Sequence, residues 1–251
     1  MRYNAPIDQL RLEFLRECGG VLPNHVGDSL CRRLAPQLSA VLEMEPGETL
    51  AHVGGELQSI YIPGNGVFKS VMLGEDGTHQ VVYFYWPGEL MEFSGLALRR
   101  FLTDIVAVVR SRVYAFTLSD IERLGQKDPS VLELLLAHAS ERLAESEKSQ
   151  FMLGSLSAAQ RVAFLLTDTL QRCEHMSPTP RLSMPMSRAD LASYLGIAPE
   201  TVSRLLGWFQ KEGLIRILPG RIVEVTGEVT IHEILVGAIH FRSPLSRALA
   251  P

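Results

Sequence analysis

We predict an α+β protein from this sequence: an N-terminal β jelly roll, a long dimerisation helix and a C-terminal winged helix-turn-helix. Three observations support the prediction. Residues 40–118 read as short strands between turn signals, the periodicity becomes helical from about Pro129, and a helix-turn-helix pattern followed by a hairpin pattern lies near the C-terminus. We expect three segments: a jelly-roll sensor domain at 25–126, the dimerisation helix at 127–157 and the C-terminal domain at 158–232.

Composition and charge set the class of protein. The 251-residue chain can form one large or two modest domains, and its 46% hydrophobic and 21% charged residues are typical of a soluble globular protein. The net charge of −4 excludes a basic nucleic-acid coat, so charge must be examined locally. The chain lacks an apolar run of about 18 residues, a signal-peptide core and a disulfide framework. We expect a cytoplasmic protein without a membrane partner.

The N-terminal half carries the strand pattern. Apolar runs such as SIYI and VVYFY are separated by the turn signals PG, GNG, EDG and PG. Several short strands at regular spacing are typical of a compact antiparallel barrel or jelly roll. Such barrels often hold a ligand, but a packed barrel wall produces the same pattern.

A helical seam follows the strands. Its residues are separated by three and four positions, with apolar ends and a polar middle: Leu136, Ala139, Leu143, Ser146, Gln150 and Leu153. One interpretation is a helix packed on its own barrel. The interpretation we favour is the interface of a homodimer that associates weakly, because the centre of the seam is polar and flanked by Glu145 and Glu147.

A second helix is expected at 158–172, where apolar residues gather on one side. Residues 174–187 are rich in Pro and Ser and indicate a loop or a strand pair. Ser187 and Asp190 then have the spacing of a capping box, with Asp in place of the usual Glu. A helix from Arg188 to Leu195 should end at Gly196.

The next helix begins at Pro199, which is favoured at the first helical position because its missing N–H is not needed there. Two helices joined by a tight turn with Gly form the helix-turn-helix pattern. The segments LIRIL and RIVEV flank Pro219-Gly220 and predict a β-hairpin wing.

A helical wheel divides the helix that begins at Pro199 into two faces. One face is apolar and should pack inward: Val202, Leu205, Leu206 and Phe209. The other face is polar and flat: Glu200, Ser203, Arg204, Gly207 and Lys211. A DNA major groove is wide enough to admit such a helix. Double-stranded DNA is therefore the expected partner.

Local charge agrees with this expectation. Residues 181–223 contain six basic and three acidic residues, so this segment carries +3 in a chain of net charge −4. A simpler interpretation remains for Glu200 and Arg204, because an acid and a base four residues apart can form a surface ion pair on a helix.

The run SRADLASYLGIAPETVSRLLGWFQKEGLI resembles the winged helix-turn-helix of the Crp/Fnr superfamily of bacterial transcription regulators. The resemblance covers about residues 25–230 and implies a cyclic-nucleotide-binding-like sensor domain followed by a dimer helix and a DNA-binding domain. It also implies RNA polymerase as a partner. Members like the fumarate-nitrate regulator read TTGAT half-sites with the pattern E-x-x-S-R, which here falls on Glu200, Ser203 and Arg204.

The resemblance implies which residues contact DNA bases and which operator sequence is bound. Members like the cyclic-AMP receptor carry Arg and Gly where this chain has Pro199 and Ser203, so a TTGAT-N4-ATCAA-like palindrome is expected rather than a TGTGA type. Arg pairs with guanine and Glu accepts from cytosine, which agrees with that assignment. The expected phosphate contacts are Ser187, Arg188, Thr201 and Arg221. Control of oxygen- or nitrogen-oxide-linked metabolism is implied.

The chain departs from its relatives at the sensor. The fumarate-nitrate regulator holds an iron–sulfur cluster on four cysteines, whereas this chain has only Cys18, Cys31 and Cys173. Part of a cyclic-nucleotide motif is present, and the candidate effector pocket comprises Gly88, Glu89, Leu90, Arg99 and Arg100. The two arginines are about two positions out of register with the family's phosphate-binding Arg-Ser.

Haem is another alternative, with His52 and His79 as candidate ligands. We expect no cofactor and no small ligand, as in FixK-like members that are controlled by their abundance. A cyclic-nucleotide- or haem-responsive regulator is the alternative function. A ligand-binding module with a vestigial DNA domain is disfavoured by the intact E-x-x-S-R face. No metal site and no enzyme activity are expected, because the sequence shows no metal-ligand cluster and no nucleophile–base pair.

Overall fold

The computed structural model describes residues 5–18, 25–74, 76–173 and 181–226, together with 231, 233 and 235. The chain forms two compact units, Met1–Ala144 and Glu145–Pro251. The first is rich in strands and the second contains a helix-turn-helix, so the predicted fold class is confirmed. The three predicted segment boundaries stay predictions, because the units meet within one long helix.

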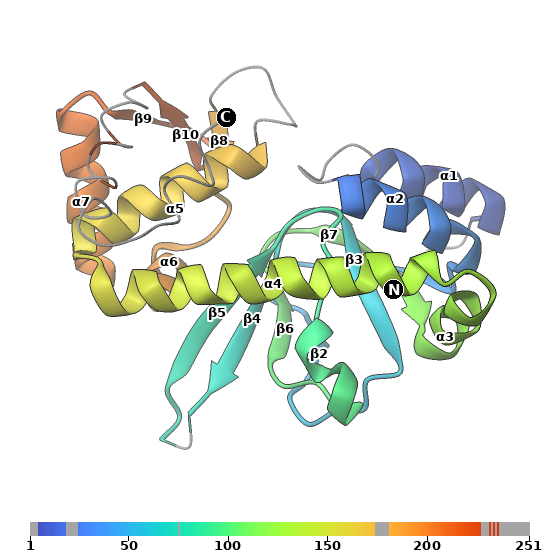
Figure 1. Ribbon diagram of the computed structural model, residues 1–251. Coiled ribbons are helices and arrows are strands. Elements are labelled where there is room, and N and C mark those ends of the chain that lie inside the picture. The colour runs from blue at the N-terminus through green and yellow to red at the C-terminus, as the bar shows by residue number, and fades with distance from the viewer. Residues whose placement is uncertain are drawn as a thin grey trace. The chain divides into compact units, whose positions relative to one another are not determined.

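The first unit contains a barrel of two antiparallel sheets (Figure 1). One sheet has the order β1-β7-β3 and the other β2-β6-β4-β5. The strands cover the region predicted from the turn signals: β1 (Ala40–Met44), β2 (Thr49–Ala51), β3 (Ser59–Asn65), β4 (Phe68–Leu73), β5 (His79–Tyr85), β6 (Asp104–Ala107) and β7 (Ser111–Thr117). At the β3–β4 turn Gly66 has φ 76°, and a Cβ there would collide with Ser111.

Helices precede the barrel strands, interrupt them once between β5 and β6, and follow them. They are α1 (Ile7–Cys18), α2 (His25–Leu34), η1 (Ala35–Gln37), η2 (Phe93–Leu98), α3 (Leu118–Lys127) and α4 (Ser130–Ser155). Helix α1 was not predicted from the sequence. The structure shows that α1 buries Leu10 and Phe14, and the Phe14 ring packs edge-on against Tyr114 with centroids 4.9 Å apart. The barrel core therefore extends to α1.

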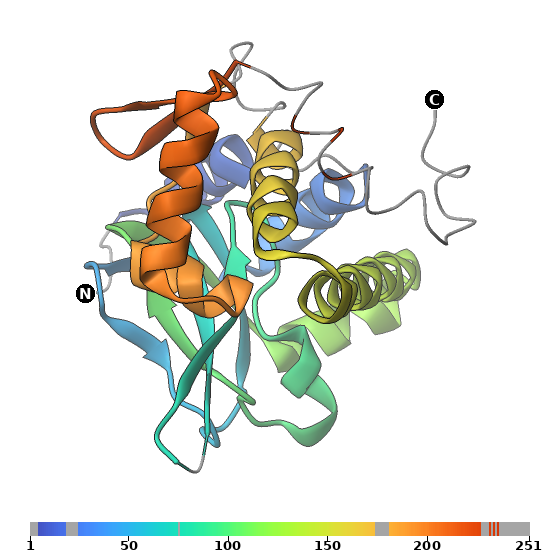
Figure 2. The ribbon, with the colours of Figure 1, turned by 90° about the vertical axis from the view of Figure 1, so that its left-hand side faces the viewer.

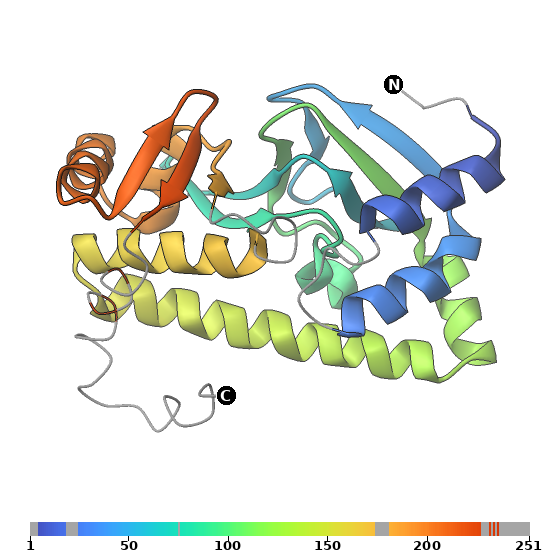
Figure 3. The same cartoon turned by 90° about the horizontal axis from the view of Figure 1, so that it is seen from above.

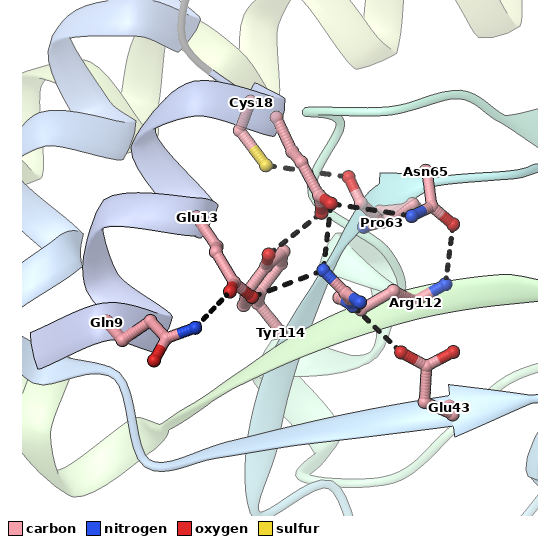
Figure 4. Close-up of polar contacts among 9 residues, drawn as sticks. Gln9, Glu13, Cys18, Glu43, Pro63, Asn65, Arg112 and Tyr114 are labelled. Atoms are coloured by element: carbon pink, nitrogen blue, oxygen red, sulfur yellow. Dashed lines mark hydrogen bonds and ion pairs between the residues drawn. The ribbon is translucent and has the colours of Figure 1, made fainter. Parts of the chain in front are cut away.

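An arginine ties α1 to the barrel (Figure 4). Arg112 on β7 donates to Glu43 on β1 at 2.8 Å and to Glu17 on α1 at 3.0 Å, and lies 3.3 Å from Glu13. The Tyr114 hydroxyl donates to the other oxygen of Glu17 at 2.8 Å. Burial, followed by this bond to Glu17, raises the pKa of Tyr114, which keeps the hydroxyl a donor. The network fixes α1 against two strands.

The second unit contains the C-terminal half of α4, the helices α5 (Ala158–Cys173), α6 (Arg188–Leu195) and α7 (Pro199–Lys211), and the strands β8 (Arg181–Ser183), β9 (Ile215–Leu218) and β10 (Ile222–Val225). α5 runs back along α4, where Arg172 contacts Glu145 at 3.0 Å (Figure 3). The strands form one antiparallel sheet in the order β8-β10-β9. The predicted wing hairpin is confirmed, and β8 adds a third strand.

The Arg112 network makes a testable contribution to stability. We expect Arg112→Met to lower the free energy of unfolding of the first unit by about 1.5–3 kcal/mol, because it leaves three partly buried carboxylates without their cation. Trp86 lies in this unit and Trp208 in the other, so urea unfolding followed by Trp86 fluorescence in a Trp208→Phe background reports on the barrel.

The matched control is Arg110→Met, which removes an exposed pair with Glu45. That change should stay within about 0.5 kcal/mol. Equal changes in the free energy of unfolding for the two substitutions would show that the Arg112 network does not stabilise the first unit.

Candidate nucleic-acid interface

α6 begins with the predicted capping box. The Ser187 hydroxyl accepts the Asp190 backbone N–H at 3.0 Å and donates to the Asp190 carboxylate at 2.8 Å. Asp190 also accepts the Ser187 N–H at 3.2 Å, so Asp serves in the place of Glu. Ser187 was predicted to contact phosphate. Its hydroxyl is engaged in the cap, where it both donates and accepts a hydrogen bond.

The turn between the helices follows the sequence prediction. Gly196 ends α6 in the left-handed conformation, with φ 61° and ψ 39°. Ala198 precedes α7 without a side-chain cap, and Pro199 occupies the first turn. A Gly C-cap and a Pro start therefore define the angle between the two helices.

α7 has the two faces that the wheel predicted. Val202, Leu206 and Phe209 are buried against the rest of the second unit. The opposite face is exposed along its length: Glu200, Ser203, Arg204, Gly207 and Lys211. Nothing lies within 4 Å of a Cβ placed at Gly207, so this face is flat and open. The apolar face anchors the helix, and the polar face is exposed.

The surface ion pair between Glu200 and Arg204 is not formed. The Arg204 guanidinium instead donates to the Thr201 hydroxyl at 3.2 Å, which holds the arginine along the helix. Among the residues that the structure describes, Glu200 forms no hydrogen bond or ion pair with another side chain. Thr201 was predicted to contact phosphate, and here its hydroxyl orients Arg204.

Arg161 on α5 holds the helix-turn-helix against the end of α4. One nitrogen donates to the Leu153 carbonyl at 2.7 Å and another to that of Leu156 at 3.0 Å, both at the end of α4. The third donates to the Leu195 carbonyl at 2.9 Å, at the end of α6. One cation thus satisfies the last carbonyls of two helices. This role of Arg161 was not predicted, because its partner Leu195 on α6 is 34 positions away in the sequence.

The wing brings two predicted phosphate contacts together. Arg221 follows the Pro219-Gly220 turn with φ 58° and donates to the Pro185 carbonyl at 2.6 Å, next to the start of α6. Arg188 starts α6, and burial followed by the charge of Arg221 lowers the pKa of its guanidinium. Two positive charges near a helix N-terminus are typical of an anion-binding site. Figure 2 shows the hairpin beside α7.

Other charges in this region are less available. Arg216 on β9 is paired with Glu224 on β10 at 3.0 Å across the hairpin. The side chain of Arg181, which the local charge count included, lies outside the described residues. The positive charge of the face therefore rests on Arg188, Arg204 and Arg221, with Lys211 near the end of α7.

The predicted dimer seam is exposed. Leu136 and Leu143 expose 72% and 63% of their surface, and Leu153 is also exposed. Ser146 and Gln150 are exposed and Ala139 is half-buried. The interpretation of a seam packed on its own barrel is therefore wrong for these residues, because the buried residues of α4, such as Val131 and Met152, lie off the seam.

The residues of the predicted effector pocket have the following contacts in the first unit. Gly88 turns the chain with φ 85°, Leu90 is buried, and Glu89 accepts the Trp86 backbone N–H at 3.1 Å. Arg99 pairs with Glu122 on α3, and Arg100 donates to the Gly54 carbonyl at 2.8 Å. The two arginines thus have partners outside a common pocket with Glu89.

The remaining sensor candidates are two histidines and three cysteines, of which Cys18 and Cys31 lie side by side. His52 is exposed at 3.6 Å from Asp104, and His79 is exposed. Cys18 and Cys31 are buried thiols, and the Cys173 side chain lies outside the described residues. The described part of the chain contains no group of three His, Cys, Asp or Glu side chains able to hold a metal. Within that part, no helix is long and apolar enough to span a membrane.

Comparison with known proteins places both units. Residues 41–128 match the cyclic nucleotide-binding domain family and residues 160–226 match the Crp-like helix-turn-helix domain family. The regulatory protein HlyX of Actinobacillus pleuropneumoniae is 28% identical over 186 residues, which cover 72% of this chain and 78% of HlyX. The fumarate and nitrate reduction regulatory protein of Escherichia coli is also 28% identical, covering 72% of this chain and 74% of that protein.

A solved structure shows the same fold. FixK2 from Bradyrhizobium japonicum superposes with a TM-score of 0.71 at 24% identity, covering 77% of this chain and 96% of FixK2. The two matched domains occur in the order of the two units described above. The chain belongs to the Crp/Fnr family of DNA-binding transcription regulators, and its sequence is similar to that of the fumarate and nitrate reduction regulator.

Proposed function

We propose that this regulator binds a TTGAT-N4-ATCAA-like palindrome as a homodimer and controls oxygen- or nitrogen-oxide-linked metabolism. The observation that carries the proposal is the outward face of α7, where Glu200, Ser203 and Arg204 are all exposed. The names of its relatives, which refer to fumarate and nitrate reduction, support the metabolic assignment.

The chemistry of the three residues suits this half-site. Arg204 can donate two hydrogen bonds to guanine, and Glu200 can accept from the amino group of a cytosine. Ser203 lies between them and can contact a thymine. Thr201 holds Arg204 along the helix before DNA arrives, so less side-chain entropy is lost when the arginine binds its base.

Phosphate contacts supply affinity and fix the register on the duplex. Arg188 and Arg221 lie together at the start of α6, where the backbone N–H groups and the helix dipole also favour an anion. We assign one phosphate to this position, with Ser187 contributing through its cap of the helix. Thr201 is the remaining phosphate candidate at the start of α7.

The seam of α4 supports the homodimer. Leu136, Leu143 and Leu153 are exposed and would be buried in a symmetric pair, whereas Ser146 and Gln150 would lie at its centre. Polar residues at the centre weaken the association, so the fraction of dimer depends on protein concentration. A dimer presents two copies of α7 about 34 Å apart, one turn of DNA. RNA polymerase is the further partner we propose.

The operator class can be tested by a gel shift at low salt. We expect the full-length protein to shift a duplex carrying TTGAT-N4-ATCAA more strongly than the same duplex with scrambled half-sites. Addition of cyclic AMP should leave the shift unchanged, which distinguishes the proposal from a cyclic-nucleotide-responsive regulator. Equal affinity for both duplexes would contradict the assigned sequence while leaving the family intact.

Arg204 should carry sequence information. We expect Arg204→Ala to cost about 1–3 kcal/mol on the palindrome and to abolish discrimination at the guanine, as measured by titration against duplexes substituted at that base. Arg204→Lys is the matched control, because it keeps the charge but loses the two-pronged geometry. A uniform loss of affinity for all duplexes would make Arg204 a phosphate contact.

Leu143 should control dimerisation. We expect Leu143→Asp to shift the protein toward the monomer in sedimentation velocity and to remove the preference for two half-sites over one, because a charge enters an apolar contact. Leu73→Asp on β4 is the matched control, since Leu73 is also an exposed leucine but lies away from the seam. An unchanged monomer fraction in Leu143→Asp would exclude this face as the interface.

A further inference from the structure

The interior of the barrel contains polar and aromatic side chains that the DNA-binding function does not use. They include six buried residues of the first unit: Ser70, Tyr83, Tyr85, Glu89, Glu92 and Thr103. We call this group the acidic cage. Buried carboxylates are costly unless they are protonated or paired, so a cation in the cage would stabilise their charged form.

The aromatic wall of the cage comes from β5. Tyr83 and Tyr85 are two residues apart and therefore lie on the same face of the strand. Their rings meet edge to face, with centroids 4.9 Å apart. Burial raises the pKa of Tyr85 to about 12, so its hydroxyl stays neutral and the negative charge of the cage comes from its carboxylates.

Two carboxylates complete the cage. Glu89 accepts hydrogen bonds from the Tyr83 hydroxyl at 3.3 Å and from the Trp86 backbone N–H at 3.1 Å. Glu92 is 1% exposed, and one of its oxygens accepts the Thr103 hydroxyl at 2.7 Å. The other oxygen, Oε2, is buried and has no hydrogen-bond partner in the described part of the chain.

The backbone at Glu92 supports a role beyond packing. Its φ of 57° is in the left-handed region, which is unfavourable for a residue with a side chain. Burial raises the pKa of Glu92, while Thr103, the Leu102 backbone N–H and the charge of Arg142 oppose that rise. Arg142 is thus close enough to act on this buried acid.

Arg142 reaches the cage from α4. Its guanidinium carbon lies 3.4 Å from the centroid of the Tyr83 ring and 5.5 Å from that of Tyr85. A planar guanidinium on an aromatic face is a favourable arrangement, and a guanidinium loses less hydration on burial than an ammonium. Arg142 lies in the part of α4 that belongs to the first unit, so barrel and arginine form one body.

We propose that the acidic cage is a guanidinium-binding site and that Arg142 is its resident ligand, supplied by α4. The site selects a planar cation because two tyrosine rings and two buried carboxylates line it. An anion such as a cyclic nucleotide would meet those carboxylates and would have to displace Arg142. The cage thereby fastens the N-terminal half of α4 to the barrel.

The test removes the resident ligand and replaces it from solution. In a Trp208→Phe background, thermal unfolding of the first unit is followed by Trp86 fluorescence. We expect Arg142→Ala to lower the unfolding temperature by several degrees and millimolar n-propylguanidinium to restore much of the loss. n-Propylammonium at the same concentration should restore nothing, and neither compound should stabilise the chain that retains Arg142, because its site is filled.

Two further variants identify the site. Glu92→Gln added to Arg142→Ala should abolish the rescue, because the buried acid is gone. Arg123→Ala removes an exposed arginine on α3 that pairs with Asp120, and it should change the unfolding temperature little. Rescue of equal size by both compounds, or an unchanged unfolding temperature in Arg142→Ala, would overturn the proposal.

Two further outcomes need their own measurements: misfolding of Arg142→Ala, and binding of an anion by Arg142. If Arg142→Ala does not fold, Arg142→Lys keeps the stem and the charge, and we expect it to unfold at a lower temperature than the parent because it lacks the planar group. An unchanged temperature in Arg142→Lys would contradict the site. Stabilisation of the parent by cyclic AMP that is lost in Arg142→Ala would show that Arg142 binds an anion, which would also overturn the proposal.

Discussion

The geometry of the DNA-binding unit depends on one guanidinium. Arg161 donates to carbonyls at the ends of α4 and α6, where each helix leaves its last carbonyls unpaired and concentrates the negative end of its dipole. Without this cation, two sets of backbone acceptors would face each other. Because α6 sets the start of α7 through the turn at Gly196, the same contact fixes the recognition helix against the end of the helix that bears the seam.

The side chains of α7 that are neither buried nor paired within the protein are the ones available to DNA. Val202, Leu206 and Phe209 take the apolar face into the core, and Thr201 takes one hydrogen bond of Arg204. Glu200 is left outside any ion pair in the described part of the chain, although its spacing from Arg204 would permit one. A surface pair of this kind contributes only a few tenths of a kcal/mol, so a nearby hydroxyl is enough to redirect the arginine.

Local signals in the sequence predicted the second unit well. Ser187 with Asp190, Gly196 and Pro199 each determine backbone geometry within four residues, so the cap, the turn and the helix start were predictable. Arg161 and Arg112 were not, because their partners are up to 99 positions away. The packing of α1 on the barrel was missed for the same reason. The contacts of Arg99 with Glu122 and of Arg100 with Gly54 were not predicted, because these partners lie 23 and 46 positions away.

The two faces of α4 have different environments: one is exposed to solvent and the other packs on the barrel. Leu136 and Leu143 point to solvent and suit a partner helix, whereas Arg142, one position before Leu143, lies on the tyrosine rings of the barrel. On the proposals above, a barrel closed by its own arginine leaves little room for a diffusible anionic effector. The equilibrium that could still be regulated is then dimerisation through the two seams, which the polar residues Ser146 and Gln150 keep weak. Protein abundance would therefore set DNA occupancy, because a dimer places two recognition helices on one palindrome and a monomer only one.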